Sequence, residues 1–270
     1  MNRIAFALII LSLFAGITST RMKAGDPKAA DAKAADDEHV FHVLVMAETG
    51  GVHGPFVKEA KVWLEDLAKK ENFTVDYIEN ADKINDDFLS KYQLFLQLNY
   101  PPYAWNDVAK EAFKKYMTEG MGGWVGLHHA SLIGEFDGYH PWPWFQDFMG
   151  GITWKNYIPK FASGRVNVED KDHPVMKDVP ASFVIKKEEW YTYDKSPRES
   201  ADVHVIASVD ESSYVPDGKV KMGDHPVIWT NDKIKARNIY IFMGHSPVLF
   251  DDDAYKLILK NAILWAGGRN

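Results

Sequence analysis

The sequence of 270 residues contains no cysteine. Without thiols the chain can form no disulfide bond, and it has no thiol to act as a nucleophile. The chain also lacks clustered lysine and arginine, and its formal net charge is −7. Because nucleic-acid binding depends on clustered positive charge, we predict no nucleic-acid partner.

The remaining composition is that of a globular protein with many aromatic residues. Apolar residues make up 46% of the chain and charged residues 26%, which suits a protein with a hydrophobic core. Aromatic residues make up 13%, including nine tryptophans. Many of them gather in residues 136–151, which are predicted to form either one wall of a sugar-binding cleft or a flap packed on its own aromatics.

The N-terminus has the pattern of a targeting segment. Arg3 precedes an apolar run over residues 4–17, and small residues follow it. This predicts a signal peptide over residues 1–20, with an uncleaved anchor as the alternative. Residues 21–38, rich in alanine, lysine and aspartate, are predicted to be a flexible leader before a folded domain over residues 39–270. We therefore expect an exported protein, periplasmic or extracellular, with no stable membrane insertion after signal removal.

Strand and helix patterns alternate in the first half of the domain. A nearly continuous apolar run over residues 40–47 predicts a central parallel strand that is covered on both faces, and a proline or asparagine marks the start of each intervening helix. The predicted strands cover residues 40–47, 74–78, 92–98 and 124–128. The predicted helices begin at Pro55 and after Asn106, and the second ends at Gly120, with Val108 among its inward-facing residues. This order is typical of an α/β sheet.

The second half is richer in strand patterns. They cover residues 165–168, 183–185, 189–193, 203–209, 226–229 and 238–243. A final helix is predicted over residues 254–265. We expect these strands to extend the same sheet with some antiparallel members, within one domain.

Residues 121–130 are the most informative segment. They predict a short buried strand that ends in a sharp turn framed by glycines and then enters a helix. Such an elbow presents one side chain at the carboxyl edge of a sheet, and that position usually holds a nucleophile. In this chain it holds His128.

Other polar residues also follow predicted strands. His53 follows the first strand, His129 lies at the elbow, and His245 follows the strand that ends near residue 243. Because ligands of open α/β sheets bind beyond the carboxyl ends of the strands, these histidines are candidate site residues. Glu188 and Glu189 also lie at a strand, where alternation would let only one of them face the cleft.

Several segments taken together resemble the ThuA-like (trehalose utilisation) family. The resemblance runs from about residue 40 to residue 268, and it rests on the order of GGWVGLHHA, PWFQDFMGG, EEWY, PVIWT and NIYIFMGHS. It implies a class I glutamine amidotransferase-like fold, a flavodoxin-like three-layer sandwich with a mostly parallel central sheet. The chain departs from the family pattern at Trp124, where a smaller apolar residue is common.

The resemblance also implies residue roles. His128 stands where amidotransferases have the catalytic cysteine, so no glutaminase activity is expected. His128, Glu189 and His245 match recurring polar positions and are the predicted catalytic residues. The predicted substrate-binding residues are His53, His129, Trp190, Tyr191 and Trp229. The resemblance further implies a role in carbohydrate catabolism and a functional link to a sugar dehydrogenase that makes 3-keto sugars.

Three functions remain as hypotheses. In the first, His128, His245 and Glu189 perform acid–base chemistry, such as isomerisation, elimination or hydrolysis, on a keto-sugar or disaccharide derivative. This hypothesis requires no cofactor. In the second, a divalent metal ion bound by these residues and His53 supports hydrolysis, although the chain lacks an H-E-x-x-H motif. In the third, the chain is a non-catalytic carbohydrate-binding protein.

Overall fold

The computed structural model describes residues 41–269, so the predicted signal peptide and leader lie outside the described residues. The strands of the main sheet are β1 (Phe41–Ala47), β2 (Phe73–Ile78), β3 (Leu94–Leu98), β4 (Gly123–Leu127), β6 (Ala162–Val168), β7 (Ser182–Glu188), β9 (Val203–Val215), β10 (Pro226–Asn231) and β11 (Asn238–Ile241). A separate two-stranded sheet contains β5 (Trp154–Tyr157) and β8 (Tyr191–Tyr193).

Five α-helices and four short 3-10 helices lie between the strands of residues 41–269. The α-helices are α1 (Gly54–Glu71), α2 (Asp86–Leu89), α3 (Asp107–Glu119), α4 (Pro143–Phe148) and α5 (Asp253–Ala266). Short 3-10 helices are η1 (His128–Ser131), η2 (Pro174–Met176), η3 (Pro197–Glu199) and η4 (Pro247–Asp251). Within residues 41–269, no helix is both long enough and apolar enough to cross a bilayer.

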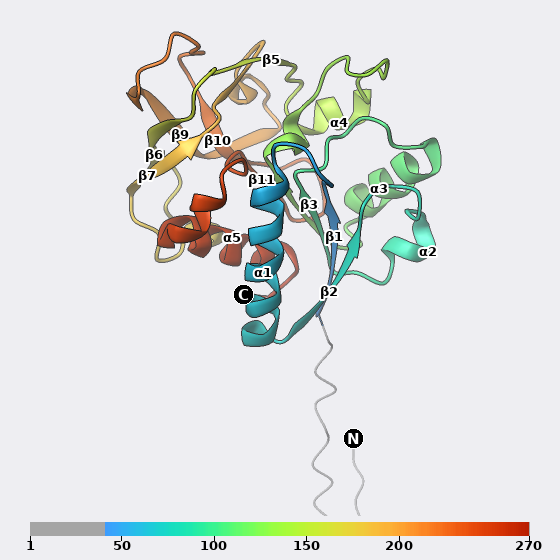
Figure 1. Cartoon of the computed structure of the whole chain (residues 1–270). Helices are drawn as coiled ribbons and strands as arrows, with labels where there is room; N and C mark the ends of the chain where they lie inside the picture. The colour runs from blue at the N-terminus through green and yellow to red at the C-terminus, as the bar shows by residue number, and fades with distance from the viewer. Residues whose placement is uncertain (1–40, 270) are drawn as a thin grey trace, which may run out of the picture. The chain divides into compact units, whose positions relative to one another are not determined.

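The main sheet combines a parallel half and an antiparallel half. Its order is β2-β1-β3-β4-β11-β10-β9-β6-β7. The strands from β2 to β11 pair in parallel, and those from β11 to β7 pair antiparallel. Figure 1 shows α1 and α5 on one side of the parallel strands and α2 and α3 on the other. The predicted three-layer α/β class, with antiparallel strands added in the second half, is therefore confirmed.

Helix α3 begins and ends as its sequence predicts. The Asn106 side chain accepts a hydrogen bond from the backbone N–H of Ala109 at 2.9 Å, and Gly120 ends the helix with φ of 68°. The prediction that Val108 faces inward is wrong, because Val108 is 64% exposed. The buried stripe instead starts at Ala109, one residue and about 100° further round the helix.

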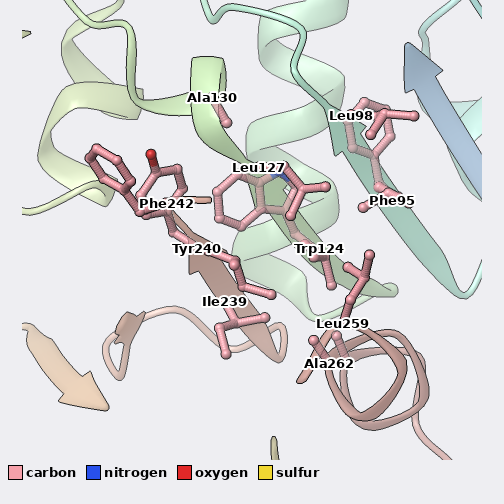
Figure 2. Close-up of a cluster of buried hydrophobic side chains, with 14 of the residues drawn as sticks. Phe95, Leu98, Trp124, Leu127, Ala130, Ile239, Tyr240, Phe242, Leu259 and Ala262 are labelled. Carbon is pink, nitrogen blue, oxygen red and sulfur yellow. The ribbon is translucent and has the colours of Figure 1, made fainter. Parts of the chain in front are cut away.

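Trp124 packs between the parallel strands and helix α4, with its ring 6.1 Å from that of Phe145 and 5.0 Å from that of Phe148. Figure 2 shows it among side chains of β3, β4, β11 and α5. Its indole N–H donates a hydrogen bond to the Gln97 side-chain oxygen at 3.1 Å. A Cβ atom on Gly126 would lie 2.1 Å from the Trp124 ring. The large residue at position 124 therefore depends on glycine two residues later.

Two local predictions differ from the structure. The elbow after β4 enters only the four-residue 3-10 helix η1, because the chain leaves helical geometry at Leu132. The strand predicted over residues 189–193 is broken: β7 ends at Glu188, just after Lys187 with its positive φ of 52°. The chain then joins β5 as strand β8, which leaves the main sheet.

The aromatic segment after the elbow is divided between core and surface. Trp142, Phe145 and Phe148 are buried, and they pack on one another. Phe136 and Tyr139 lie nearer the surface and stack on Tyr103. Most of the segment therefore packs on aromatic rings rather than forming an open wall.

Candidate functional site

Four histidines from three strand ends meet at one point. His53 directly precedes α1, His128 and His129 begin η1, and His245 follows β11. The ring centroid of His53 lies 5.2 Å from that of His128, 4.0 Å from that of His129 and 4.4 Å from that of His245. The structure thus brings together all the histidines that the sequence suggested for the site.

His128 is fully buried, and the contacts of its ring show which nitrogen carries the proton. Its Nδ1 lies 3.1 Å from the backbone carbonyl oxygen of Phe242. Because a carbonyl oxygen can only accept, Nδ1 carries the proton of the neutral ring. Burial, with the nearby His129, His53 and His245, holds the pKa of His128 well below its usual value. His128 is therefore neutral, and its Nε2 presents a lone pair at 2.8 Å from the Tyr191 hydroxyl.

A buried hydroxyl network holds the elbow. His128 has a positive φ of 43°, an uncommon conformation for a residue with a side chain. Its carbonyl oxygen accepts hydrogen bonds from Tyr240 at 2.8 Å and from Ser131 at 3.0 Å. The Ser131 hydroxyl also lies 2.7 Å from the hydroxyls of Tyr193 and Tyr240. These contacts hold the strained residue in place and fix the direction of its ring.

Glu189 lies between two of the histidines. Its Oε2 atom is 3.7 Å from Nε2 of His128 and 3.7 Å from Nε2 of His245. Among the predicted catalytic residues it is the one that links the elbow to the end of β11. A carboxylate in this position can accept a proton from either ring or bind a cation between them.

Glu188 also reaches the site, although alternation predicted that only one of the two glutamates could. Its carboxyl group accepts hydrogen bonds from the backbone N–H groups of Gly244 at 3.2 Å and His245 at 3.3 Å. Burial raises the pKa of Glu188 to about 8, against the effect of these hydrogen bonds. Alternation fails here because β7 ends at Glu188 after the left-handed residue Lys187. Glu188 therefore supports the loop that carries His245.

Glu48 is a site residue that the sequence analysis missed. Its Oε2 atom lies 3.3 Å from Nδ1 of His53 and 3.1 Å from Nδ1 of His129. Burial alone would raise the pKa of Glu48, but hydrogen bonds and charge from His129 and His53 lower it to about 2. Glu48 directly follows β1, so the rule that drew attention to the histidines could also have found it.

Asn99 and Phe161 also touch the site. The Asn99 side-chain amide donates a hydrogen bond to the carbonyl oxygen of Gly244 at 2.5 Å. The ring of Phe161 lies 4.5 Å from the ring of His245. Asn99 directly follows β3, so its position at a strand end could have identified it as a candidate. Nothing in the sequence near Phe161 points to the site.

The three aromatic residues predicted to bind substrate occupy different places. Tyr191 stacks on His128 with a centroid distance of 4.5 Å. Trp190 and Trp229 are each only 1% exposed, so the structure corrects their prediction as direct substrate contacts. Both lie in the core because other aromatic rings cover them: Trp190 stacks on Phe242, and Trp229 packs on Tyr240.

The cluster has the donor set of a divalent transition-metal site. One donor atom from each of His53, His128 and His129 lies within 4.8 Å of the others, and the same holds for His53, Glu189 and His245. Two ligands of a tetrahedral zinc ion are about 3.4 Å apart, close to the 3.7 Å between Glu189 and each of two histidines. Nε2 of His53 is buried with no hydrogen-bond partner in residues 41–269. Imidazole and carboxylate groups at these spacings fit such an ion.

The fold and the elbow define the class of protein. It is an α/β protein with a class I glutamine amidotransferase-like fold, and His128 stands at the elbow after β4. A protein from Thermoplasma acidophilum, assigned as part of a GMP synthase, shares the fold at 11% identity, with a TM-score of 0.51 over 83% of this chain and 93% of its own.

The comparisons then identify the family. The family model described as trehalose utilisation, ThuA, matches residues 42–266. A ThuA-like protein from Bacteroides uniformis is 33% identical, with a TM-score of 0.74 over 84% of this chain and 91% of its own. Another from Parabacteroides merdae is 19% identical, with a TM-score of 0.61 over 85% and 90%. No curated protein matches the sequence significantly. The chain belongs to the ThuA family.

Proposed function

We propose that this protein is an enzyme of carbohydrate catabolism that transfers protons on a keto-sugar or a related disaccharide derivative. The observation that carries the proposal is the buried ring of His128, whose Nδ1 lies against the carbonyl oxygen of Phe242 and whose Nε2 lies beside Tyr191 and Glu189. A neutral imidazole in this tautomer is a general base. The family description, trehalose utilisation, supports a sugar as the substrate.

The proposed reaction starts at the carbon next to the sugar carbonyl. Nε2 of His128 takes a proton from this carbon, and the C–H electron pair forms a carbon–carbon double bond as the carbonyl oxygen becomes an enolate. Tyr191, which donates to Nε2 before the reaction, can then donate to the enolate oxygen. Burial raises the pKa of Tyr191 well above its usual value, so its proton stays on the hydroxyl.

The second proton transfer belongs to Glu189 and His245 in this proposal. They lie 3.7 Å apart and next to His128. A proton returned to the former carbonyl carbon completes an isomerisation, once the adjacent hydroxyl has passed its proton to the enolate oxygen and become the new carbonyl. A proton given to a departing glycosidic oxygen, as the enolate electrons expel it, completes an elimination. Hydrolysis of a disaccharide would instead need a water molecule activated by one of the same groups.

The test compares His128→Ala and His245→Ala with the unaltered protein on 3-keto-glycosides and on the unoxidised sugars. Products are identified by NMR, and exchange of the acidic carbon-bound proton is followed in D₂O. We expect both variants to lose turnover, and His128→Ala to lose the exchange as well. His140→Ala is the control, because His140 is exposed on the surface. Full turnover by both folded variants would overturn the proposal, and sugar binding without any product would favour a binding protein.

A divalent metal ion is the second candidate, because the buried Nε2 of His53 has no hydrogen-bond partner in residues 41–269. His53, His128, His245 and Glu189 would hold the ion. When bound, it would polarise a sugar carbonyl or lower the pKa of a water molecule. Elemental analysis of the purified protein tests this, with His53→Ala expected to reduce the metal content. Activity that persists in chelator, without stoichiometric metal, would remove this candidate.

A further inference from the structure

One carboxylate oxygen of Glu48 faces two histidine rings of the cluster. Its Oε2 atom lies 3.1 Å from Nδ1 of His129 and 3.3 Å from Nδ1 of His53. All three atoms are buried, and within residues 41–269 neither Nδ1 has another hydrogen-bond partner. Both contacts are bent away from ideal hydrogen-bond alignment, so charge carries much of the attraction. Glu48 is therefore the group that determines what each Nδ1 carries.

The backbone fixes the position of Glu48 beside these rings. Its N–H donates a hydrogen bond to the carbonyl oxygen of Leu98, at the end of β3, at 3.0 Å. The chain then turns at Gly50 and Gly51, which have positive φ values of 72° and 64°, and reaches His53 just before α1. The side chain of Glu48 is 20% exposed, whereas that of His53 is 4% exposed. Glu48 thus lies on the solvent side of His53 and is anchored there by β3.

The carboxylate of Glu48 selects one tautomer of both rings. A neutral imidazole carries one proton, and the partner of the ring determines which nitrogen carries it. A carboxylate oxygen only accepts hydrogen bonds. An unprotonated Nδ1 would turn its lone pair toward this oxygen and would be repelled. The proton therefore lies on Nδ1 of His53 and of His129, and the lone pair of each ring lies on Nε2.

The ring of His53 adjoins every other histidine of the cluster. Its centroid lies 4.0 Å from that of His129, 4.4 Å from that of His245 and 5.2 Å from that of His128. Its Nε2 atom is buried and has no hydrogen-bond partner within residues 41–269. A buried acceptor without a donor is unfavourable. This nitrogen is therefore left for a donor group of a ligand.

We propose that Glu48 is a positioning residue, which holds His53 and His129 with the proton on Nδ1 and so keeps Nε2 of each ring as a hydrogen-bond acceptor for the bound substrate. This proposal rests on the proposed function, because it describes how the same site binds its substrate. Glu48 acts through the two rings and touches no reacting atom. Its loss should therefore weaken binding and leave the proton transfer at His128 in place.

Long-range proton–nitrogen NMR of the histidine rings measures the tautomers directly. In the unaltered protein, Nδ1 of His53 and His129 should give the signal of a protonated nitrogen, and Nε2 that of an unprotonated one. The spectra of His53→Ala and His129→Ala assign these signals. Glu48→Leu keeps a side chain of similar size but removes the acceptor, so at least one of the two rings should move its proton to Nε2. A protonated Nε2 on either ring of the unaltered protein would overturn the proposal.

Kinetics on a 3-keto-glycoside separate positioning from packing. Glu48→Leu should raise KM about tenfold, which corresponds to about 1.4 kcal/mol of binding. It should keep kcat, and the exchange of the acidic proton in D₂O, within about twofold. A side chain that only filled space would be replaced by leucine without this change. Glu135→Leu is the matched control, because Glu135 makes a carboxylate–Nδ1 contact of the same length, 3.3 Å, with His140 at the surface.

The outcomes separate this role of Glu48 from the proposed reaction. An unchanged KM in folded Glu48→Leu, while the keto-sugar is still converted, overturns the role of Glu48 alone. Loss of the exchange at saturating substrate also overturns it, because Glu48 would then take part in the proton transfer. If the unaltered protein converts no keto-sugar, the proposed function fails, and the NMR spectrum still determines the tautomers. If Glu48→Leu does not fold, the spectrum of the unaltered protein and the KM of Glu48→Gln decide.

Discussion

Replacing Gly244 by alanine would add one methyl group where three parts of the site meet. A Cβ atom at this position would lie 2.7 Å from Cβ of His128 and 2.8 Å from the side-chain oxygen of Asn99. Carbon atoms in contact are normally about 3.5–4.0 Å apart, so the new group overlaps His128 by about 1 Å. His128 and Asn99 are both fully buried, and neither can move into solvent.

The size of the effect follows from this overlap. Forcing an extra methyl group into a packed interior costs about 1–3 kcal/mol of stability. A displacement of about 1 Å in a catalytic group can reduce turnover roughly 100-fold, which corresponds to about 2.7 kcal/mol of barrier. We therefore expect Gly244→Ala to fold with reduced stability and to lose most of its activity.

Urea unfolding and turnover of a 3-keto-glycoside measure the two effects separately. Gly54→Ala is the matched control, since Gly54 begins α1 beside His53 and a Cβ there would meet no atom within 4 Å. This control should keep its activity and its stability. If Gly244→Ala retained more than half of the normal turnover and unfolded at the normal urea concentration, the packing of Gly244 against His128 would control neither activity nor stability.

Four further predictions concern the pH dependence of activity and the stability of the fold. Because burial and neighbouring histidines hold the pKa of His128 below its ordinary 6.5, activity should fall on the acid side only below pH 6.5; a limb at or above 6.5 in the pH–rate profile would contradict this. Tyr191→Phe removes a hydrogen bond to the neutral ring and should move that limb to higher pH. Asn99→Ala should lower the free energy of unfolding by about 2 kcal/mol, from a lost hydrogen bond and a positive φ of 56°; Asn99→Gly, which accepts that φ, should lose about half as much. Burial would raise the pKa of Glu211, but hydrogen bonds from His225 and backbone N–H groups lower it below 4.5. The stability that Glu211 contributes is therefore present above pH 4.5 and is lost as the pH falls through the lowered pKa. Urea unfolding at pH 3 to 6 should show this loss in the unaltered protein and not in Glu211→Gln.

The parallel half of the fold could be predicted because local sequence and tertiary structure agree there. Strand β3 is fully buried, and all of its residues except Gln97 are apolar. Asn106 and Gly120 mark the ends of α3 through hydrogen bonds and backbone conformations that depend on nearby residues alone. The break between β7 and β8 could not be predicted, since it depends on the left-handed Lys187 and on pairing with β5.

The candidate site was predictable only as far as strand ends could be located. His53, His128 and His245 each follow a strand, and parallel strands bring their carboxyl ends to one edge. Trp190 and Phe161 depend instead on contacts between residues far apart in the chain. The indole of Trp190 binds the carbonyl of Ala162, 28 residues earlier, and no local pattern encodes this pairing. The prediction for Trp190, which follows the candidate carboxylate Glu189, therefore gave the right region of the structure. It gave the wrong role, because Trp190 is a buried residue rather than a substrate contact.

The elbow shows why the same fold need not share a reaction with the amidotransferases. A thiolate at position 128 would attack a carbonyl carbon and form a covalent intermediate. The His128 ring instead donates from Nδ1 to the carbonyl oxygen of Phe242 and faces the Tyr191 hydroxyl with Nε2. This arrangement leaves one lone pair, that of Nε2, with a fixed direction, and the ring holds no leaving group. Such a group is suited to accepting a proton or binding a metal ion. In the proposed function, the strained backbone of the elbow aims this acid–base group instead of exposing a nucleophile.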